Sequence, residues 1–296
     1  MPQKIAVIGL GSMGYGIAQS CLRAGHVTHG VDTRPEQSEK LRSEGGAPGD
    51  LHQIAKDLDA AVIVVLNAQQ TEAVLTDLLP RLSPSAAVIA CATIPPDAAR
   101  AMAAKASEHG VHYLDAPISG GSVKAAQGAL TIMASGTPQA FDAAVQTLDA
   151  IAETVFRLGD EPGAGSAMKA VNQLLAGVHI ATMAEAMSFG ISQGISPETF
   201  MEVIPNCAGS SWMLENRGPH IVNADYTPHS QVNIWPKDLG IVLDIARAAG
   251  FPAAITETAL KQYEAAQQMG LGAEDDAAVA KVYAARAGLN LPGDGQ

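Results

Sequence analysis

The alternation of β-rich runs with helical segments over residues 4–160 constrains the fold more than any other feature of this sequence. The β-rich runs, which contain mainly Val, Ile and Ala, are 4–10, 26–32, 60–66, 86–91 and 111–117. Ala-rich helical segments such as 13–24 and 97–109 lie between them. Strands that alternate with helices along a chain form parallel sheets that are covered by helices on both faces.

Two further β-rich runs, 129–135 and 154–159, flank a helical segment at 138–151, and we expect them to extend the same sheet. After Gly163 the pattern becomes helical throughout, and the first helix, at about 165–193, is unusually long. The later helical segments are 197–205, 211–223, 236–249, 255–269 and 275–286. The sequence therefore predicts three parts, which are a Rossmann-type α/β domain with a mostly parallel sheet (1–162), a long interdomain helix (163–194), and an all-α domain (195–296).

Composition and charge exclude several classes of protein. Hydrophobic residues make up 47% of the 296 positions, which is enough for a sizeable core and too much for a disordered chain. The net charge of −12 argues against binding nucleic acid or an anionic membrane through the overall field. Three widely spaced cysteines suggest neither a disulfide framework nor a metal site. Because we find no secretory signal and no uninterrupted apolar span of 18 residues, we expect a cytoplasmic protein with no membrane segment.

The motif Gly9-Leu10-Gly11-Ser12-Met13-Gly14 is a G-x-G-x-x-G between a predicted strand and a predicted helix. In that context the first glycine makes a tight turn, the second admits a pyrophosphate, and the third lets helix and strand pack closely. The helix N-terminus, including Ser12 and Met13, would face the phosphates. The alternative is a glycine turn in an α/β domain that binds no nucleotide.

Two residues at the end of the second strand bear on the choice of cofactor. The Asp32 carboxylate is placed to bind a ribose 2′-hydroxyl and would repel a 2′-phosphate, which favours NAD. Arg34 leaves NADP open, because an arginine there can hold the 2′-phosphate. It can equally stack on adenine or lie in solvent.

A second group of polar residues lies further along the chain. Ser119-Gly120-Gly121 follows a predicted strand, and adjacent glycines let backbone N–H groups point together at an anion, although the segment could also be an ordinary turn. Lys169 and Asn172 are three residues apart on the long helix and so are neighbours on its surface. A lysine near a helix N-terminus, if partly buried, is biased towards its neutral form and can then exchange a proton with a substrate hydroxyl.

Several motifs in one order resemble the β-hydroxyacid dehydrogenases, the family of 3-hydroxyisobutyrate dehydrogenase. The motifs are VIGLGSMG (7–14), DAPISGG (115–121), GALTIMASG (128–136), GAGSAMKAVNQ (163–173), KDLG (237–240) and GLGAEDDAAV (270–279). The resemblance covers nearly the whole chain, and it implies that the helical part at 195–296 serves substrate binding and oligomerisation. Within the family, segments 67–75, 172–181 and 211–228 are most similar to the members that oxidise L-threonate.

The resemblance implies a role for each residue that matches a family motif. Lys169 matches the catalytic lysine, and Asn172 matches the asparagine that binds substrate beside it. Ser119, Gly120 and Gly121 match the loop that holds the substrate carboxylate. Thr93 and Lys237 match residues that contact the cofactor. One departure is that many members read D-x-S-T where this chain has Ala90-Cys91-Ala92-Thr93.

The implied reaction is hydride transfer from a small hydroxy acid to NAD, with L-threonate and its 2-keto acid as the expected substrate and product. The alternatives are a reductase of a small aldehyde acid such as tartronate semialdehyde, and a dinucleotide-binding protein without catalysis. A polyhydroxy acid needs several hydrogen-bond partners, and we expect Asn67, Trp212, Asn216 and Arg217 to supply some of them. Because a helix of about 28 residues is roughly 42 Å long and apolar along its length, we also expect a homodimer or homotetramer.

Overall fold

In the computed structural model, which describes residues 2–294, the chain forms two compact units, one extending to Lys169 and the other from Ala170. The first unit contains a five-stranded sheet in the order β2-β1-β3-β4-β5, and every neighbouring pair is parallel. Its strands are β1 (Lys4–Ile8), β2 (Val27–Val31), β3 (Ala60–Ile63), β4 (Ala87–Ala90) and β5 (His112–Asp115). The predicted parallel sheet is therefore confirmed.

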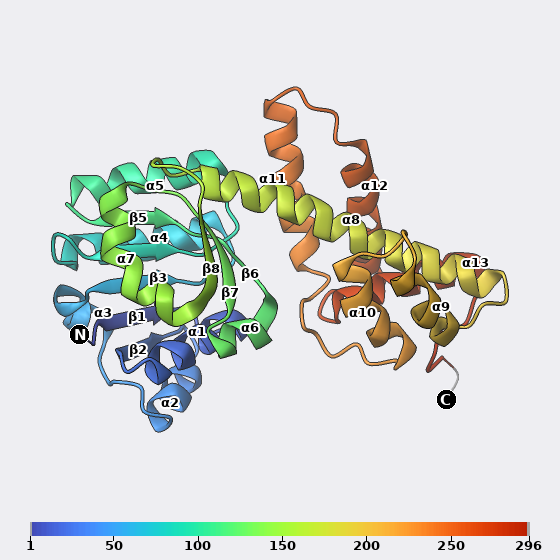
Figure 1. The fold of residues 1–296 in the computed structure, drawn as a ribbon, viewed down its shortest axis with the longest axis horizontal. Coiled ribbons are helices and arrows are strands. Elements are labelled where there is room, and N and C mark those ends of the chain that lie inside the picture. The colour runs from blue at the N-terminus through green and yellow to red at the C-terminus, as the bar shows by residue number, and fades with distance from the viewer. Residues whose placement is uncertain (1, 295–296) are drawn as a thin grey trace. The chain divides into compact units, whose positions relative to one another are not determined.

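Helices bury both faces of this sheet (Figure 1). On β1, Ile5 and Val7 belong to one hydrophobic cluster, whereas Ala6 and Ile8 belong to another, as the two-residue period of a strand requires. The first cluster includes residues of α1 (Ser12–Arg23) and α7 (Pro138–Ile151). The second includes residues of α4 (Ala68–Leu78) and α5 (Pro96–Glu108). Shorter helices are α2 (Pro35–Ser43), α3 (Leu51–Ile54) and α6 (Gly121–Gln127).

The prediction that segments 129–135 and 154–159 extend this sheet is wrong. They form β7 (Leu130–Ala134) and β8 (Ala152–Arg157), which belong to a separate sheet in the order β6-β7-β8 together with β6 (Ile118–Ser119). A strand has only two edges, and those of β7 pair with β6 on one side and β8 on the other. Its link to β5 is therefore reduced to a single bridge between Asp115 and Ser135.

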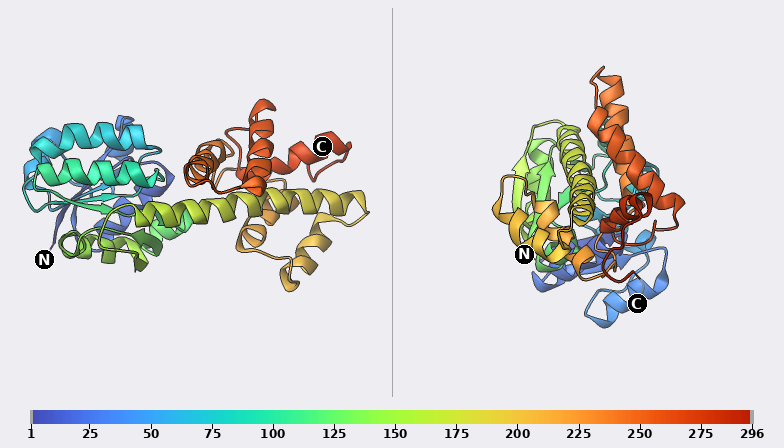
Figure 2. Two further views of the ribbon diagram at one scale, coloured as in Figure 1. Left: turned by 90° about the horizontal axis from the view of Figure 1, so that it is seen from above. Right: turned by 90° about the vertical axis from the view of Figure 1, so that its right-hand side faces the viewer.

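Helix α8 (Ala164–Ser192) begins in the first unit and continues into the second. The second unit also contains α9 (Pro197–Val203), α10 (Trp212–Val222), α11 (Ile234–Ala248), α12 (Ala254–Gln268) and α13 (Ala280–Ala287). These helices gather around the C-terminal part of α8 (Figure 2). The predicted segment 275–286 begins with a 3₁₀ turn at Asp276–Val279 before α13.

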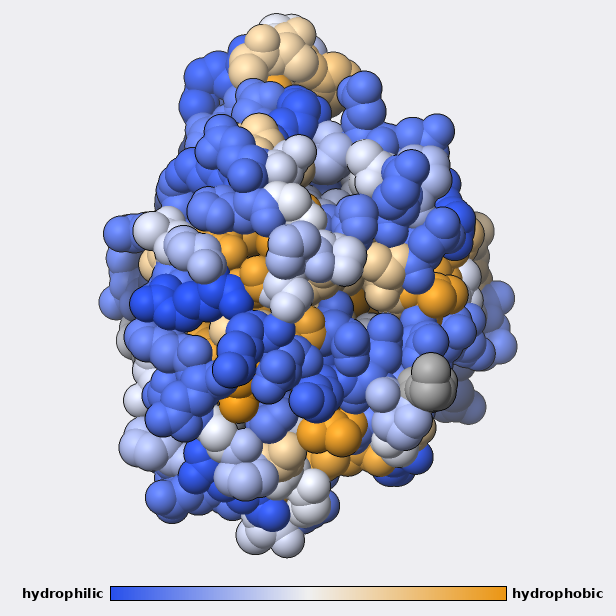
Figure 3. Space-filling model, turned by 90° about the vertical axis from the view of Figure 1, so that its left-hand side faces the viewer, coloured by the Kyte–Doolittle hydropathy of each residue, from blue (hydrophilic) through white to orange (hydrophobic). Residues whose placement is uncertain are grey.

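By length and composition α8 could cross a membrane, but a core helix of a globular protein meets the same criteria. Ile180, Met183 and Met187 of α8 are almost completely buried in the hydrophobic core of the second unit. That packing gives α8 the role of a core helix. The face drawn in Figure 3 is mostly hydrophilic, and its hydrophobic residues form separate patches.

Candidate active site

Many of the predicted site residues of the first unit follow the carboxyl ends of the parallel strands. The Gly9 turn follows β1, Asp32 follows β2, Thr93 follows β4, and Ser119 lies beyond β5. Ligands of open α/β sheets bind at this edge, where the strand order reverses, and here the reversal lies between β1 and β3. Along the edge the order is Asp32, the glycine turn, Thr93 and then Ser119. Neighbouring strands are about 4.8 Å apart, so the edge from β2 to β4 is roughly as long as an extended dinucleotide.

The first and third glycines of the turn are required by the geometry of the protein itself. Gly9 has φ of +94°, and a Cβ there would lie 2.3 Å from the Val64 carbonyl oxygen. A Cβ on Gly14 would lie 1.8 Å from the Gly9 carbonyl oxygen, which shows how closely α1 packs on the turn. These two glycines have the functions that the motif predicts for them.

Gly11 has a different environment. A Cβ built on it would meet no protein atom within 4 Å, and Gly11 and Ser12 are both exposed. Met13, the next residue of α1, is half-buried against the core of the first unit. The N-terminus of α1 is therefore accessible, and the missing side chain at Gly11 leaves room for the phosphates of a dinucleotide.

Asp32 connects the end of β2 to the glycine turn. Its Oδ2 accepts a hydrogen bond from the Leu10 N–H at 2.7 Å, and its Oδ1 accepts from the Arg34 N–H at 2.9 Å and the Arg34 Nε at 3.2 Å. Burial alone would raise the pKa of Asp32, but the hydrogen bonds from Arg34 and Leu10 outweigh it and hold that pKa below its usual range. Asp32 is therefore an ionised carboxylate at neutral pH.

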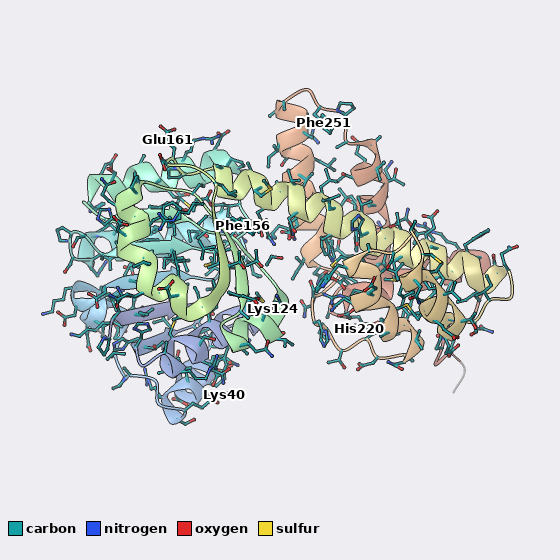
Figure 4. All side chains as sticks on the ribbon, in the orientation of Figure 1. Lys40, Lys124, Phe156, Glu161, His220 and Phe251 are labelled. Carbon is teal, nitrogen blue, oxygen red and sulfur yellow. The ribbon has the colours of Figure 1, made fainter. Side chains whose placement is uncertain are left out.

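An open hollow of about 490 Å³ lies beside the glycine turn. Helices α1, α2 and α6 line it, and Gly11, Ser12, Arg34 and Lys40 are among the lining residues. Lys40 lies on α2 (Figure 4), with its Nζ 4.6 Å from the centre of the Tyr15 ring. Two cations thus border the hollow, and one of them, Arg34, is paired with Asp32.

Thr93 is half-buried in the segment after β4, where the chain departs from the D-x-S-T pattern of many family members. Ala90 and Ala92 are almost completely buried, so methyl groups fill the positions of the acid and the serine. Cys91 is also buried, and burial raises the pKa of its thiol to about 12. The thiol is therefore protonated and unreactive at neutral pH.

Lys169 lies against the segment that precedes the two glycines of the predicted anion-binding loop. It is 8% exposed, and its Nζ donates a hydrogen bond to the Ile118 carbonyl oxygen at 2.9 Å. Ser119 follows Ile118 directly, and Gly120 and Gly121 then adopt φ angles of +132° and +75°. The structure therefore brings together Lys169 and the loop at 119–121, although about fifty residues separate them in the chain.

A buried polar cluster holds the first turn of α8, and the sequence interpretation missed it. Asp115 is fully buried, and it accepts hydrogen bonds from the Ser166 Oγ, the Ser135 Oγ and the backbone N–H groups of Gly163 and Ser166. Burial raises the pKa of Asp115 above its usual range, while these hydrogen bonds act in the opposite direction. The available signal was an aspartate directly after a buried strand, at Asp115-Ala116-Pro117.

In the second unit, Asn172 and Lys237 are the two ends of one side-chain network. Asn172 Nδ2 donates to Gln173 Oε1 at 3.0 Å, and Gln173 Nε2 donates to Asp238 Oδ2. Lys237 Nζ lies 2.6 Å from Asp238 Oδ1. The network connects α8 to α11, and Gln173 and Asp238 are both buried.

The residues expected to add substrate contacts are mostly engaged elsewhere. Arg217 is buried and its Nε donates to Asp276 Oδ1 at 2.6 Å, while its Nη1 donates to Asn216. Asn67 Oδ1 accepts from the Gln70 N–H as the N-cap of α4. Trp212 is 64% exposed. Arg217 therefore stabilises the core of the second unit, and within residues 2–294 no group of three or more His, Cys, Asp or Glu is arranged to hold a metal.

The fold and the glycine turn define a dinucleotide-binding oxidoreductase, and comparisons with known proteins identify the family. Residues 4–159 match the NAD-binding domain of 6-phosphogluconate dehydrogenase, and residues 163–283 match the NAD-binding domain of NADP-dependent 3-hydroxyisobutyrate dehydrogenase. The chain belongs to the β-hydroxyacid dehydrogenase family, and it is a hydroxyacid dehydrogenase that uses a nicotinamide dinucleotide. The resemblance inferred from the motifs is confirmed.

Individual relatives cover almost the whole chain. The chain is 47% identical to an L-threonate dehydrogenase of Cupriavidus necator, over 99% of each protein. It is 46% identical to the crystal structure of a 3-hydroxyisobutyrate dehydrogenase from Salmonella typhimurium, with a TM-score of 0.90 over 95% of this chain and 99% of that one. The 3-hydroxyisobutyrate dehydrogenase of Mycobacterium tuberculosis, whose structure was solved with L-serine, is 28% identical with a TM-score of 0.85 over 95% of this chain and 99% of that one.

Proposed function

We propose that this protein oxidises L-threonate to 2-dehydro-L-threonate with NAD, and that Lys169 is the general acid/base. The proposal is supported by the name of the 47% identical relative and by the position of Lys169 beside an anion-binding loop. The single observation that carries it is the buried Nζ of Lys169, 2.9 Å from the carbonyl oxygen of Ile118. A buried lysine amine next to a turn of two glycines is suited to a substrate that has a carboxylate and a hydroxyl close together, because a neutral amine can accept the hydroxyl proton.

Each part of the site has a defined task in this proposal. When bound, the nicotinamide accepts the hydride from the substrate carbon. Lys169 takes the proton of the substrate hydroxyl, Asn172 orients that hydroxyl, and the Ser119 hydroxyl and the N–H groups of Gly120 and Gly121 hold the carboxylate. Gly9, Gly11, Gly14 and the start of α1 at Ser12 and Met13 hold the pyrophosphate. Thr93 and Lys237 contact the cofactor.

The test is a panel of hydroxy acids and aldehyde acids with both cofactors, followed by absorbance of the reduced nicotinamide. The highest kcat/KM should belong to L-threonate in the oxidative direction. A higher value for an aldehyde acid in the reductive direction would favour a reductase of substrates such as tartronate semialdehyde. No turnover of any substrate, with dinucleotide still bound, would leave only the function of a non-catalytic binding protein.

Variants of Lys169 test the mechanism separately from the substrate. A positioned proton-transfer group contributes about 10²–10⁴ in rate, so Lys169→Ala should lower kcat by that factor and leave NAD affinity nearly unchanged. Lys169→Arg should not restore activity, because a guanidinium stays charged and cannot accept the proton. Asn172→Ala should mainly raise KM. If folded Lys169→Ala kept more than about a third of the wild-type kcat, the lysine would be a packing residue.

We propose that NAD is preferred over NADP because the ionised Asp32 carboxylate repels a 2′-phosphate. Arg34 is paired with Asp32 and so is less available to a phosphate, although Lys40 also borders the adjacent hollow. The preference should be at least tenfold in kcat/KM, or about 1.4 kcal/mol, and Asp32→Ala should narrow it. Equal use of both cofactors by the wild-type enzyme would instead make Arg34 a phosphate ligand.

We also infer that α8 forms an interface with a second copy in a homodimer or homotetramer. Met168, Val171, Leu175 and Phe189 of α8 are between 44% and 66% exposed, which is unusual for four large apolar side chains on one helix. Light scattering should give a multiple of 30.4 kDa at micromolar concentration, and Leu175→Arg should lower that mass. A wild-type monomer would refute the interface. We expect the assembly in the cytoplasm, which fractionation of expressing cells would test.

A further inference from the structure

Asp115 is a fully buried acid for which the proposed chemistry has no direct use, and its carboxylate lies at the start of α8. Its Oδ2 accepts from the N–H groups of Gly163 and Ser166, each at 2.9 Å, and from the Ser135 Oγ at 3.2 Å. Its Oδ1 accepts from the Ser166 Oγ at 2.6 Å. The carboxylate thus accepts four hydrogen bonds, three of which come from the beginning of α8.

These contacts satisfy the backbone donors that a helix leaves unpaired in its first turn. Ser135 takes part as well, because its Oγ accepts from the Gly165 N–H at 2.9 Å. A Cβ on Gly165 would lie 2.4 Å from the Met133 carbonyl oxygen, so the helix backbone directly contacts β7. A negative carboxylate at a helix N-terminus is also favoured by the helix dipole. Asp115 and Ser135 therefore fix the position of the first turn of α8 along the helix axis and its rotation about that axis.

Helix α8 and the segment after β5 make a second contact at Lys169. Lys169 follows Ser166 by three residues on α8, and Ile118 follows Asp115 by three residues after β5. Ser166 is bonded to Asp115, and Lys169 is bonded to the Ile118 carbonyl oxygen. Residues three apart on a helix lie on the same side, so the two contacts act as parallel ties between one helix face and one segment of chain.

We propose that Asp115 is a positioning residue, whose carboxylate holds α8 so that Lys169 stays against the loop at 119–121. This inference rests on the proposed role of Lys169 in proton transfer. Misplacement of a reacting group by about 1 Å can cost a factor of 10² in rate, so loosening this anchor should lower kcat without touching the cofactor site. Asp115 itself contacts neither substrate nor cofactor in this proposal.

The first test is Ser166→Ala, which removes one hydrogen bond and leaves the Asp115 carboxylate and both backbone donors in place. We expect kcat to fall about 10- to 100-fold while the Kd for NAD changes less than twofold. Ser188→Ala is the matched control, because Ser188 is also a buried serine of α8 but donates only to the Ala184 carbonyl of its own helix. That control should keep the wild-type kcat. A wild-type kcat in Ser166→Ala would overturn the proposal.

The second test asks whether Ser166 acts through Lys169. In the Lys169→Ala background, Ser166→Ala should change the residual kcat less than twofold, because the group that it positions is gone. If Ser166→Ala lowered kcat by the same factor in the wild-type and the Lys169→Ala backgrounds, the cluster would act independently of Lys169. The proposal would then be wrong. Full activity of Lys169→Ala alone would contradict the proposed function instead, so the two failures are distinguishable.

A third measurement does not depend on catalysis. Acetic anhydride modification, followed by mass spectrometry, reports the accessibility of each lysine, with Lys124 on α6 as an exposed internal reference (Figure 4). Buried Lys169 should be modified slowly in the wild-type protein and in Ser188→Ala. Ser166→Ala and Asp115→Asn should each raise the acetylation rate of Lys169 several-fold relative to that of Lys124. An unchanged ratio in both variants would show that the cluster does not hold Lys169.

Discussion

The three glycines of the turn after β1 should respond to alanine in different ways, although the motif treats them alike. In Gly14→Ala the new Cβ would lie 1.8 Å from the Gly9 carbonyl oxygen, and ordinary contact begins near 3.4 Å. The atom that the new Cβ would overlap belongs to the backbone and not to a flexible side chain. Helix α1 must therefore move by more than 1 Å relative to β1. Overpacking of this kind costs about 1–3 kcal/mol. For a protein of this size, that lowers Tm by about 2–12 °C.

Gly11→Ala is the matched comparison, because the added Cβ would meet no protein atom within 4 Å. Gly11 has φ of −68° and ψ of −167°, which alanine adopts without strain. The substitution should therefore leave Tm unchanged or raise it slightly, since an unstrained Gly→Ala change stabilises by roughly 0.4–1 kcal/mol. The same methyl group would occupy the space into which the pyrophosphate must come, so the Kd for NAD should rise at least tenfold.

The assay measures Tm by calorimetry without ligand and the Kd for NAD by fluorescence titration, for the wild-type protein and both variants. The expected pattern is a loss of stability in Gly14→Ala and a loss of NAD affinity alone in Gly11→Ala. An unchanged Tm in Gly14→Ala would refute the packing argument. Wild-type NAD affinity in Gly11→Ala would show that the pyrophosphate does not approach this turn.

Three further predictions concern the second unit. Arg217→Ala would leave the fully buried Asp276 without its ion-pair partner, so the free energy of unfolding should fall by about 3–5 kcal/mol in thermal unfolding. A decrease below about 1 kcal/mol would contradict this expectation. Burial opposes ionisation of Asp275, but hydrogen bonds from His220, Ala277 and His229 lower its pKa to about 2. The ionised carboxylate therefore stabilises the fold fully above about pH 4, and this contribution is lost as the pH falls towards 2. Asp275→Asn should flatten the pH dependence of stability in that interval, and an unchanged slope would refute the assignment. Tyr263→Phe removes a buried hydrogen bond of 2.6 Å to the Gly177 carbonyl oxygen and should lower stability by about 1 kcal/mol in urea unfolding, whereas an unchanged midpoint would show that this bond contributes nothing.

Features that depend only on neighbouring residues could be predicted from the sequence. The burial of β1 on both faces, with Ile5 and Val7 in one cluster and Ala6 and Ile8 in another, follows from the unbroken apolar run after the exposed Lys4. The predicted helical segment 138–151 has the bounds of α7, whose first turn begins with Pro138 and is capped by the Thr137 side chain. The glycine motif also predicted the conformation of its turn, since backbone freedom and lack of a side chain are local properties.

Contacts between distant segments could not be predicted in this way, because they depend on how the whole chain packs. Whether β7 joins the first sheet depends on competition for its two edges, and β6, a strand of two residues that no pattern indicates, occupies one of them. The Arg217 side chain is chemically suited to contact a polar substrate, but the buried Asp276, nearly sixty residues further along the chain, binds its guanidinium. Lys169 and the loop at 119–121 come together because Asp115 holds the start of α8, and no periodicity within either segment encodes that contact. Such pairings are selected by burial and by hydrogen-bond satisfaction in the folded chain, which are properties of the whole packing arrangement.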